Sequence, residues 1–395
     1  MKKKGTIIYI GGFELPDKNA AAHRVLNNAK MFRDIGFSVV LIGINRRKKY
    51  FNQASINTKS IIQGFDCYSV TYPTTVIQWY DYLSNINKYK EIFKLYPNLE
   101  VVICYDFQAL ALFKLYNYCR KIKTEFAVDC CEWYTIKGEK LIFKIAKGVD
   151  IFFRMRVIQK KISNLIVISH YLEKYYSKSE NVIIIPPLVD THDSKWDEHN
   201  LIVNEREVHI VYAGSPGRNK DKIDLIIQLL VEIDGNTKFV FDIIGITKEE
   251  YILNNDRNKN LINCTQSSVN FHGILSHIEC IEYIKNADFS IFLRDESRLS
   301  AAGFPTKFVE SITCGTPIIT NKTSDLSDYL QEGKNGYFID LKDHENMILK
   351  LTEILNSDQS QRLFMKKFCK ESKLFDYRNY IEITDNFLSK IIDKS

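Results

Sequence analysis

Residues 6–44, TIIYIGGFELPDKNAAAHRVLNNAKMFRDIGFSVVLIGI, set the fold class. Both ends of this segment, 6–10 and 38–44, are β-branched apolar runs, which is typical of parallel strands covered on both faces. Between them, the spacing of apolar side chains predicts a helix over 20–35, capped by Asn19 and ended by Gly36. A strand, a helix and a second strand within roughly 40 residues predict a βαβ unit.

The same alternation continues through the rest of the chain. Further strands are expected at 66–70, 100–104, 125–129, 164–168 and 182–185. After Pro186-Pro187, the polar stretch from Asp190 to Glu207 is interpreted as a linker. Beyond it, the pattern predicts strands at 207–213, 238–244, 269–272, 288–293, 317–320 and 336–339, and helices at 221–234, 276–286, 305–314 and 342–357.

This pattern predicts an α/β protein with two doubly wound Rossmann-like domains that face each other across a cleft. The N-terminal domain is expected to cover residues 1–187 and the C-terminal domain residues 188–375. A final helical segment, 376–395, has no strand after it, and we expect it to pack back on the N-terminal domain.

Composition excludes several classes of protein. The chain has 395 residues, of which 45% are hydrophobic, so it can bury large cores and is not disordered. No apolar run approaches the roughly 18–20 residues of a membrane-spanning helix. The lysines before the first strand imitate a signal peptide, but Gly11, Gly12 and the charges that follow favour a buried strand. The nine cysteines are scattered without the spacing of a zinc site or disulfide framework, which favours a cytoplasmic location.

The positive charge is concentrated in one segment. The net charge of the chain is +6, and residues 136–162 alone hold eight Lys and Arg against two Asp and Glu. Because the excess is local, no nucleic-acid-binding surface is indicated. The same segment interleaves its cations with apolar side chains, so it could lie on an anionic membrane as a peripheral contact. The other possibility is a helix that packs on the sheet with its lysines in water.

The sharpest local signal is GFPTKFVESITCGTP, residues 303–317. Pro305 suits the first position of a helix and Gly315 the residue past its end. Free amides at Thr306 and Lys307, with the lysine ammonium, would then form an anion site. Glu310, one turn further along, could accept hydrogen bonds from the diol of a ribose. An exposed Lys307–Glu310 pair on the helix surface is the other interpretation.

Two further segments place cations just after predicted strands, at the carboxyl edge of the C-terminal sheet where ligands of such sheets bind. The sequence YAGSPGRNKDK, residues 212–222, runs from a strand through a glycine-containing loop into a helix. It lacks the P-loop and dinucleotide glycine patterns, so by itself it is also consistent with a solvated turn. Arg294 follows an apolar strand, and a guanidinium there suits a diphosphate, although it could instead pair with Asp295 or Glu296.

Together these segments resemble the GT-B glycosyltransferases, and within them the group 1 (GT4-like) family. Residues 303–310 resemble the Gly-Phe and the final Glu of its Glu-x7-Glu signature, and "ESITCGTPII" continues it; "NADFSIFLR", "EGKNGYFID" and "NVIIIPPLVD" resemble other family segments. "GGFELPDKNAAAHRV" and "AAGFPTKFVE" are similar to segments of bacterial capsular-polysaccharide and O-antigen sugar transferases. One departure is clear, because the first signature Glu would fall at Ala302.

The resemblance implies a site for a nucleotide-diphosphate sugar in the C-terminal domain. Leaving-group stabilisation would fall to Arg218, Lys220 and Arg294, and Glu132 or Asp129 would face the acceptor. The donor would be bound by Gly11, Gly12, Gly214, Ser215, Lys222, Glu296, Gly303, Phe304, Thr306, Lys307 and Glu310. Neither a metal nor another cofactor is implied.

The function expected from the resemblance is transfer of a sugar, with retention, to a glycan or lipid-linked acceptor in bacterial surface polysaccharide assembly. The enzyme would work in the cytoplasm, or at the inner face of the membrane through residues 136–162. Other hypotheses are an inactive partner subunit, suggested by Ala302, a sugar-nucleotide epimerase, and an extracellular sugar-binding protein, which the poor signal peptide disfavours.

Overall fold

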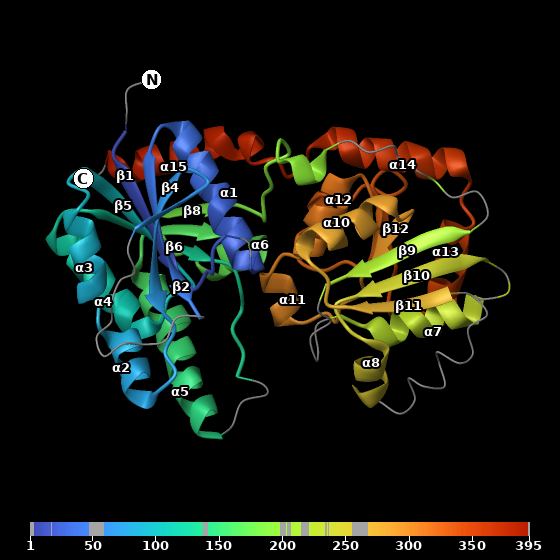
Figure 1. Cartoon of the computed structure of the whole chain (residues 1–395), viewed down its shortest axis with the longest axis horizontal. Coiled ribbons are helices and arrows are strands. Elements are labelled where there is room, and N and C mark those ends of the chain that lie inside the picture. The colour runs from blue at the N-terminus through green and yellow to red at the C-terminus, as the bar shows by residue number, and fades with distance from the viewer. Residues whose placement is uncertain are drawn as a thin grey trace. The chain divides into compact units, whose positions relative to one another are not determined.

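The computed structural model describes residues 4–16, 18–46, 59–136, 141–197, 203, 207–214, 221–233, 235, 237–254 and 268–393. The chain divides into two compact units, which Figure 1 colours along the sequence. Unit 1 comprises 1–189 and 376–395, and unit 2 comprises 190–375.

Unit 1 is built on a sheet with the strand order β3-β4-β2-β1-β5-β6-β7-β8. All its neighbouring strands are parallel except β3, which pairs antiparallel with β4 at the edge. The bounds are β1 Thr6–Gly11, β2 Ser38–Asn45, β3 Ser60–Ile62, β4 Phe65–Thr71, β5 Leu99–Tyr105, β6 Glu125–Cys130, β7 Asn164–Val167 and β8 Asn181–Ile184. The central strand β1 is buried along its whole length, as expected for a strand covered on both faces.

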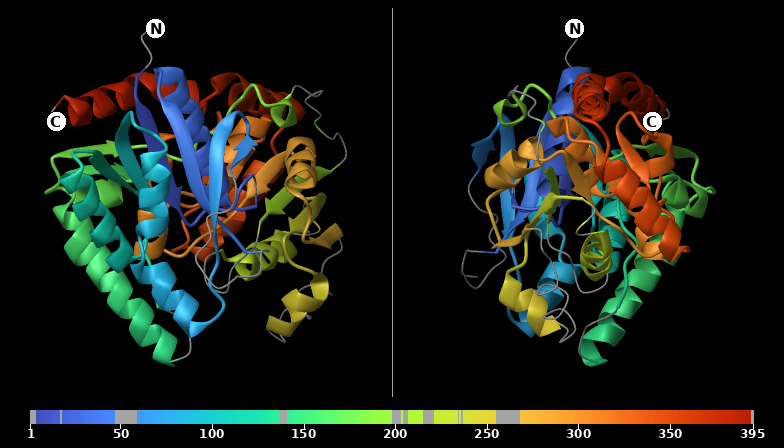
Figure 2. Two further views of the ribbon diagram at one scale, coloured as in Figure 1. Left: turned by 60° about the vertical axis from the view of Figure 1, so that its left-hand side comes forward. Right: turned by 90° about the vertical axis from the view of Figure 1, so that its right-hand side faces the viewer.

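The first helix confirms the sequence prediction in detail. Helix α1 spans Ala20–Ile35, the Asn19 side chain accepts from the Ala22 amide, and Gly36 ends the helix with a φ of 115°. The other helices of unit 1 are α2 Val76–Ser84, α3 Asn87–Lys94, α4 Ala109–Lys121, α5 Leu141–Phe152, α6 His170–Tyr175 and α15 Ile381–Ile392. A π-helical turn, Phe153–Ile158, continues α5. Helix α15 packs against α1 and β8, and Figure 2 shows these helices from two further sides.

Unit 2 has the strand order β11-β10-β9-β12-β13-β14, all parallel. Its strands are β9 Val208–Ala213, β10 Phe239–Ile244, β11 Ser268–Gly273, β12 Phe289–Ile291, β13 Ile318–Thr320 and β14 Gly336–Phe338. Its helices are α7 Ile223–Ile233, α8 Lys248–Asn254, α10 His277–Asn286, α11 Arg298–Ala302, α12 Thr306–Cys314, α13 His344–Leu355 and α14 Gln359–Ser372. This is the doubly wound arrangement that the alternation predicts.

Each sheet contains a topological switch point, where successive strands are added on opposite sides. In unit 2 the switch lies between β9 and β12, and in unit 1 between β1 and β5. Ligands of doubly wound sheets bind outside the carboxyl ends of the strands at this point, because the connecting loops diverge there. Residues 214 and 221, which follow β9, and residue 294, which follows β12, lie at the switch of unit 2.

The structure contains elements that the sequence pattern did not locate. In unit 2 these are the helices α8, α11 and α14, and in unit 1 they are the edge strand β3 and the helices α2, α3, α4 and α6. Pro305, expected as the first helical residue, is the N-cap of α12, and Thr306 is the first helical residue. Part of the expected linker, 190–197, is described and contains a short 3-10 turn at Ser194–Trp196.

Segment 136–162 is packed at its end and exposed along α5. Met155, Ile158 and Ile162 are buried. In α5 and the following turn, Ile145, Val149, Phe152 and Phe153 are all exposed, by 48 to 63%. Residues 137–140 lie outside the described part of the chain. Among the helices that the structure describes, none combines the length and the apolar character needed to cross a bilayer.

Candidate functional site

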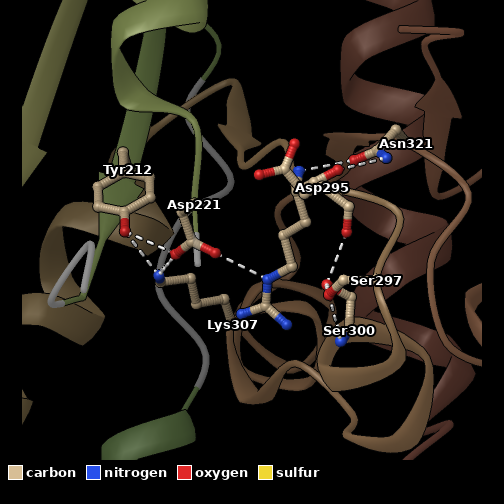
Figure 3. A network of polar contacts seen from close by, with 8 residues as sticks. Tyr212, Asp221, Asp295, Ser297, Ser300, Lys307 and Asn321 are labelled. Atoms are coloured by element: carbon tan, nitrogen blue, oxygen red, sulfur yellow. Dashed lines mark hydrogen bonds and ion pairs between the residues drawn. The ribbon is translucent and has the colours of Figure 1, made fainter. Parts of the chain in front are cut away.

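The carboxyl edge of unit 2 is organised around Asp221, whose side chain is 1% exposed. Its Oδ1 accepts from Arg294 Nε at 2.7 Å, and its Oδ2 accepts from the Tyr212 hydroxyl at 2.7 Å. The Lys307 ammonium bonds the same Oδ2 and donates to the Tyr212 hydroxyl at 2.8 Å. Figure 3 shows the Tyr212 hydroxyl, the Asp221 carboxylate and the end of Lys307 in mutual contact. One buried carboxylate therefore holds two cations at the switch point.

The electrostatics of this cluster follow from burial and charge. Burial opposes ionisation of Asp221, but the charges of Lys307 and Arg294 outweigh it and hold the pKa of that carboxyl below its usual value. Burial lowers the pKa of Lys307 to about 8, against the opposing effect of Asp221. Burial and Asp221 raise the pKa of Tyr212. At neutral pH the cluster contains an ionised carboxylate and two cations, with a net positive charge.

Arg294 is fixed at both its backbone and its side chain. Its amide donates to Asn321 Oδ1 at 2.8 Å, and its carbonyl accepts from Asn321 Nδ2 at 2.9 Å. A guanidinium has five N–H donors, and Asp221 takes the one on Nε. Among the described residues, none accepts a hydrogen bond from its terminal Nη groups. These groups can serve an anionic ligand while the residue stays in place.

Gly214 allows Lys307 to reach this cluster. Its φ is 127°, and a Cβ built there would lie 2.6 Å from Lys307 Cε. The lysine side chain passes so close to the backbone after β9 that an L side chain would displace it. Gly214 therefore has a structural role. The sequence predicted only that it contacts the donor.

The start of α12 partly agrees with the expected anion site. The N-cap Pro305 offers no side-chain acceptor, so within the described residues no cap satisfies the amides of Thr306 and Lys307. The Lys307 ammonium donates to Asp221 and Tyr212, which occupy two of its three N–H donors, so its contact with an anion at the helix start stays a prediction.

Glu310 lies one turn further along α12 and is half-buried. Its Oε1 is 3.2 Å from His277 Nε2, at the first residue of α10. Lys307, the partner that local spacing offered, bonds Asp221 instead, and His277 is the residue that contacts Glu310. A carboxylate held from one side keeps its second oxygen available to a ligand.

The segment after Arg294 carries the residues that the sequence offered for the donor sugar. Asp295 pairs with Lys222 at 2.6 Å, and Glu296 is exposed. Lys222 therefore lies at the carboxyl edge of unit 2, where it is paired with Asp295. Ala302, where the family has its first signature Glu, is fully buried at the end of α11.

Two other predicted residues flank α12. Phe304 is 7% exposed and packs against Phe308, Tyr329 and Phe375, so its side chain belongs to the core and only its backbone can face a ligand. Gly303 is half-buried, and its carbonyl accepts from the Ser324 hydroxyl. Ser215, Arg218 and Lys220 lie outside the described residues.

The switch point of unit 1 brings Gly11, Gly12 and Asp106 together. A Cβ on Gly11 would lie 2.3 Å from the Tyr105 carbonyl, so this glycine serves the close approach of β1 to β5. At Gly12 the nearest atom to such a Cβ is 3.8 Å away. Asp106 has a φ of 42° and accepts from Arg154 Nη1 at 2.6 Å. A left-handed aspartate at a strand end is a feature found at functional sites.

The two carboxylates considered for the acceptor have different surroundings. Asp129 is 1% exposed, and its two oxygens accept from Arg24 at 2.8 and 2.9 Å. The Tyr9 hydroxyl also bonds it. Asp129 is therefore a structural partner in the core, and Glu132, which is exposed after β6, remains the candidate.

Sequence reasoning missed Tyr212, Asp221, His277 and Asn321. The sequence offered one indication for Asp221, which is the single carboxylate among the Arg and Lys side chains of residues 218–222. In either unit alone, the described residues contain no cluster of three His, Cys, Asp or Glu side chains close enough to hold a metal ion.

The comparisons with known proteins relate the C-terminal part of the chain to one family of sequences. The sequence model of the glycosyl transferases group 1 matches residues 195–370, the segment that contains the Asp221 cluster, Arg294 and α12. The segment is therefore similar to the glycosyl transferases group 1, and the match covers less than half of the chain. An uncharacterized glycosyltransferase of Methanocaldococcus jannaschii is 24% identical over 176 residues, which are 41% of this chain and 45% of that protein. The match thus spans about half the length of that relative.

Solved structures show that the chain has the GT-B fold. Sucrose-phosphate synthase from Thermosynechococcus elongatus superposes with a TM-score of 0.69 at 13% identity, covering 99% of this chain and 100% of that one. The catalytic domain of starch synthase IV from Arabidopsis thaliana, bound to ADP and acarbose, gives a TM-score of 0.70 at 11% identity, with 99% and 100% coverage.

Proposed function

We propose that the protein is a glycosyltransferase that moves a sugar from a nucleotide-diphosphate sugar to a glycan or lipid-linked acceptor. The observation that carries the proposal is the position of Arg294. It lies at the switch point of the group 1 segment, fixed by Asp221 and Asn321, with its terminal guanidinium groups unbonded by other described residues.

The donor is proposed to bind along α12. The amides of Thr306 and Lys307 and the guanidinium of Arg294 offer hydrogen-bond donors and positive charge to a diphosphate. Glu310, one helical turn away, offers a carboxylate oxygen to the ribose hydroxyls. The related starch synthase IV structure holds ADP, a nucleoside diphosphate, on the same fold.

The chemistry required of these residues is stabilisation of a leaving group. As the bond between the anomeric carbon and the diphosphate oxygen breaks, its electron pair stays on that oxygen. Arg294 and the start of α12 are placed to stabilise this charge, so that the proposed reaction needs no metal. The acceptor oxygen bonds to the same face of the sugar, with retention, and its proton passes to the departing phosphate.

The acceptor is proposed to bind at the carboxyl edge of unit 1, near Gly12 and Glu132. The similarity of residues 11–25 to capsular and O-antigen transferases supports a role in surface polysaccharide assembly. The exposed apolar side chains of α5 support contact with the inner face of the cell membrane through segment 136–162. Flotation with anionic liposomes at low salt tests this contact, and protein that stays at the bottom of the gradient would contradict it.

A thermal-shift panel of UDP-, GDP- and ADP-sugars tests the proposed function. A ligand that binds only the folded protein raises its melting temperature, and at one hundred times its Kd it adds about 2.7 kcal/mol to the free energy of unfolding. We expect one nucleotide class to shift the transition and the others to leave it in place. No shift with any of them would contradict the proposal.

Ala302 favours a second candidate, an inactive partner subunit with the same fold. Its side chain is a buried methyl group, so this position lacks the carboxylate that the family signature has there. Such a protein would bind a nucleotide sugar without transferring or hydrolysing it. An epimerase would convert the donor without any acceptor.

A further inference from the structure

An apolar groove lies in unit 1 between α2, α4, α5 and the π-helical turn after α5. It has a volume of about 540 Å³, and its lining is mostly hydrophobic, with Tyr80, Leu83, Leu110, Phe113, Val149 and Phe153 among its residues. A second hollow of about 450 Å³ shares Val149 and Phe153 and adds Ile136 and Ile145. The two hollows adjoin along α5, and each has the size of a small-molecule site.

The helices that line this groove also expose apolar side chains. On α2, Tyr80, which lines the groove, is 73% exposed, and Val76 and Ile77 at the start of the helix are 85% and 82% exposed. On α5, Ile145, which lines the second hollow, is 63% exposed. Figure 1 shows α2 and α5 at the same end of unit 1. Isolated exposed hydrophobic residues are ordinary, but several of them beside a hydrophobic groove mark an interaction site.

The groove adjoins the edge where the acceptor is proposed to bind. Asp150, which lines the groove, accepts from the amide of Ala109, the first residue of α4 after β5, at 2.7 Å. Arg154, one turn later, holds Asp106 at the carboxyl end of β5. The nine residues of α5 before Asp150 therefore run past the carboxyl edge, over about 13 Å at 1.5 Å per residue.

The charges around the groove select its occupant. Lys144 and Lys161 line the two hollows, and Lys147 and Lys160 are exposed on the same segment. Among the described lining residues of both hollows, Asp150 is the one carboxylate, and the Ala109 amide and Arg154 engage it. A second copy of this chain would bring the same lysines against them. An amphiphile with an anionic head satisfies both the apolar lining and the cations.

We propose that this groove holds the hydrocarbon chain of a phosphate-headed lipid. The lysines that line the two hollows, Lys144 and Lys161, are proposed to bind the phosphate. The sugar end of the lipid extends to Gly12 and Asp106. The inference rests on the proposed transfer to a lipid-linked acceptor, and it names where the lipid part of that acceptor binds. The proposed lipid site therefore includes residues of α2 and α4 in addition to segment 136–162, which the charge pattern indicated.

Calorimetry with decyl phosphate, a monomeric amphiphile, tests the inference. Ala146→Trp fills the groove, and Ile145→Glu adds a carboxylate to its rim; both residues are exposed, so the fold tolerates them. Leu349→Glu, on the 69% exposed Leu349 of α13 in unit 2, is the matched control. We expect both groove variants to bind decyl phosphate at least tenfold more weakly than the wild type, and the control to bind equally well.

Three results would overturn the inference. One is equal affinity of all variants, and another is displacement of decyl phosphate by equimolar inorganic phosphate, which would mean a phosphate site without a chain. The third is a dimer in sedimentation that Ile145→Glu dissociates, without any lipid binding. Titration with nucleoside diphosphates separates the two proposals. Binding of decyl phosphate without binding of any nucleotide would contradict the proposed glycosyltransferase function and would still support the lipid-binding groove.

Discussion

Asp221 Oδ1 accepts a hydrogen bond from Arg294 Nε at 2.7 Å, and the two residues also form an isolated antiparallel bridge through their backbones. The guanidinium is thereby oriented by the loop after β9 although it belongs to the loop after β12. Since those strands flank the switch point, the pair joins the two halves of the sheet where a ligand is expected.

Arg294→Ala is expected to lower turnover about a hundredfold. The substitution removes about 3 kcal/mol of charge stabilisation from the departing diphosphate. Steady-state transfer rates with the donor identified by thermal shift measure the effect. Arg120→Ala, which removes an exposed cation of α4, is the control. Wild-type rates in Arg294→Ala would remove the residue from the mechanism.

Asp221→Asn is expected to destabilise unit 2 at neutral pH, and less so in acid. The pKa of Asp221 is lowered below 3.8 in the folded protein, so its charge contributes stability above that value. The contribution is lost as the pH falls through the lowered pKa, because the wild-type carboxyl then becomes neutral like the amide.

Urea unfolding of both proteins at pH 7 and at successive values below pH 4 measures this difference. Removing one partner of a buried ion pair typically costs about 3–5 kcal/mol. We expect a difference of that order at pH 7 and a smaller one at the acid end. A difference that stays constant with pH would show that the charge of Asp221 is not responsible.

Gly214→Ala tests the passage of Lys307 beside the backbone. Gly214 and Gly235 both have a positive φ, 127° and 102°, but a Cβ on Gly235 meets no atom within 4 Å. Gly235→Ala therefore carries the backbone strain alone, about 1 kcal/mol or more. Gly214→Ala is expected to lose more stability than this control and to weaken nucleotide binding as well, by thermal shift. Equal losses in the two variants would exclude a clash with Lys307.

The sequence predicted those parts of the fold that depend on residues close to one another in the chain. Apolar runs located β1 and β2, and Asn19 and Gly36 located both ends of α1, since capping acts within one helical turn. The edge strand β3 escaped prediction because it is three residues long and its apolar residues are exposed or half-buried.

The site was less predictable because its contacts are distant in sequence. Local spacing paired Lys307 with Glu310, but Lys307 bonds Asp221, 86 residues away, and Glu310 contacts His277, 33 residues away. Both partners become neighbours only when the sheet forms. Sequence could thus name the residues that gather at the carboxyl edge but not which of them bind each other.

Glu310→Gln is expected to weaken the binding of nucleoside diphosphates ten- to a hundredfold. A hydrogen bond to a charged group contributes about 1.5–3 kcal/mol, and the amide cannot accept from both ribose hydroxyls as the carboxylate does. The His277 contact can persist in this variant, because the amide oxygen still accepts a hydrogen bond. Inorganic pyrophosphate, which has no ribose, should bind both proteins equally well in calorimetry. Glu353→Gln, on the exposed face of α13, is the matched control. An equal loss for pyrophosphate and for the nucleotide would show that Glu310 acts on the diphosphate or on the fold, and not on the ribose.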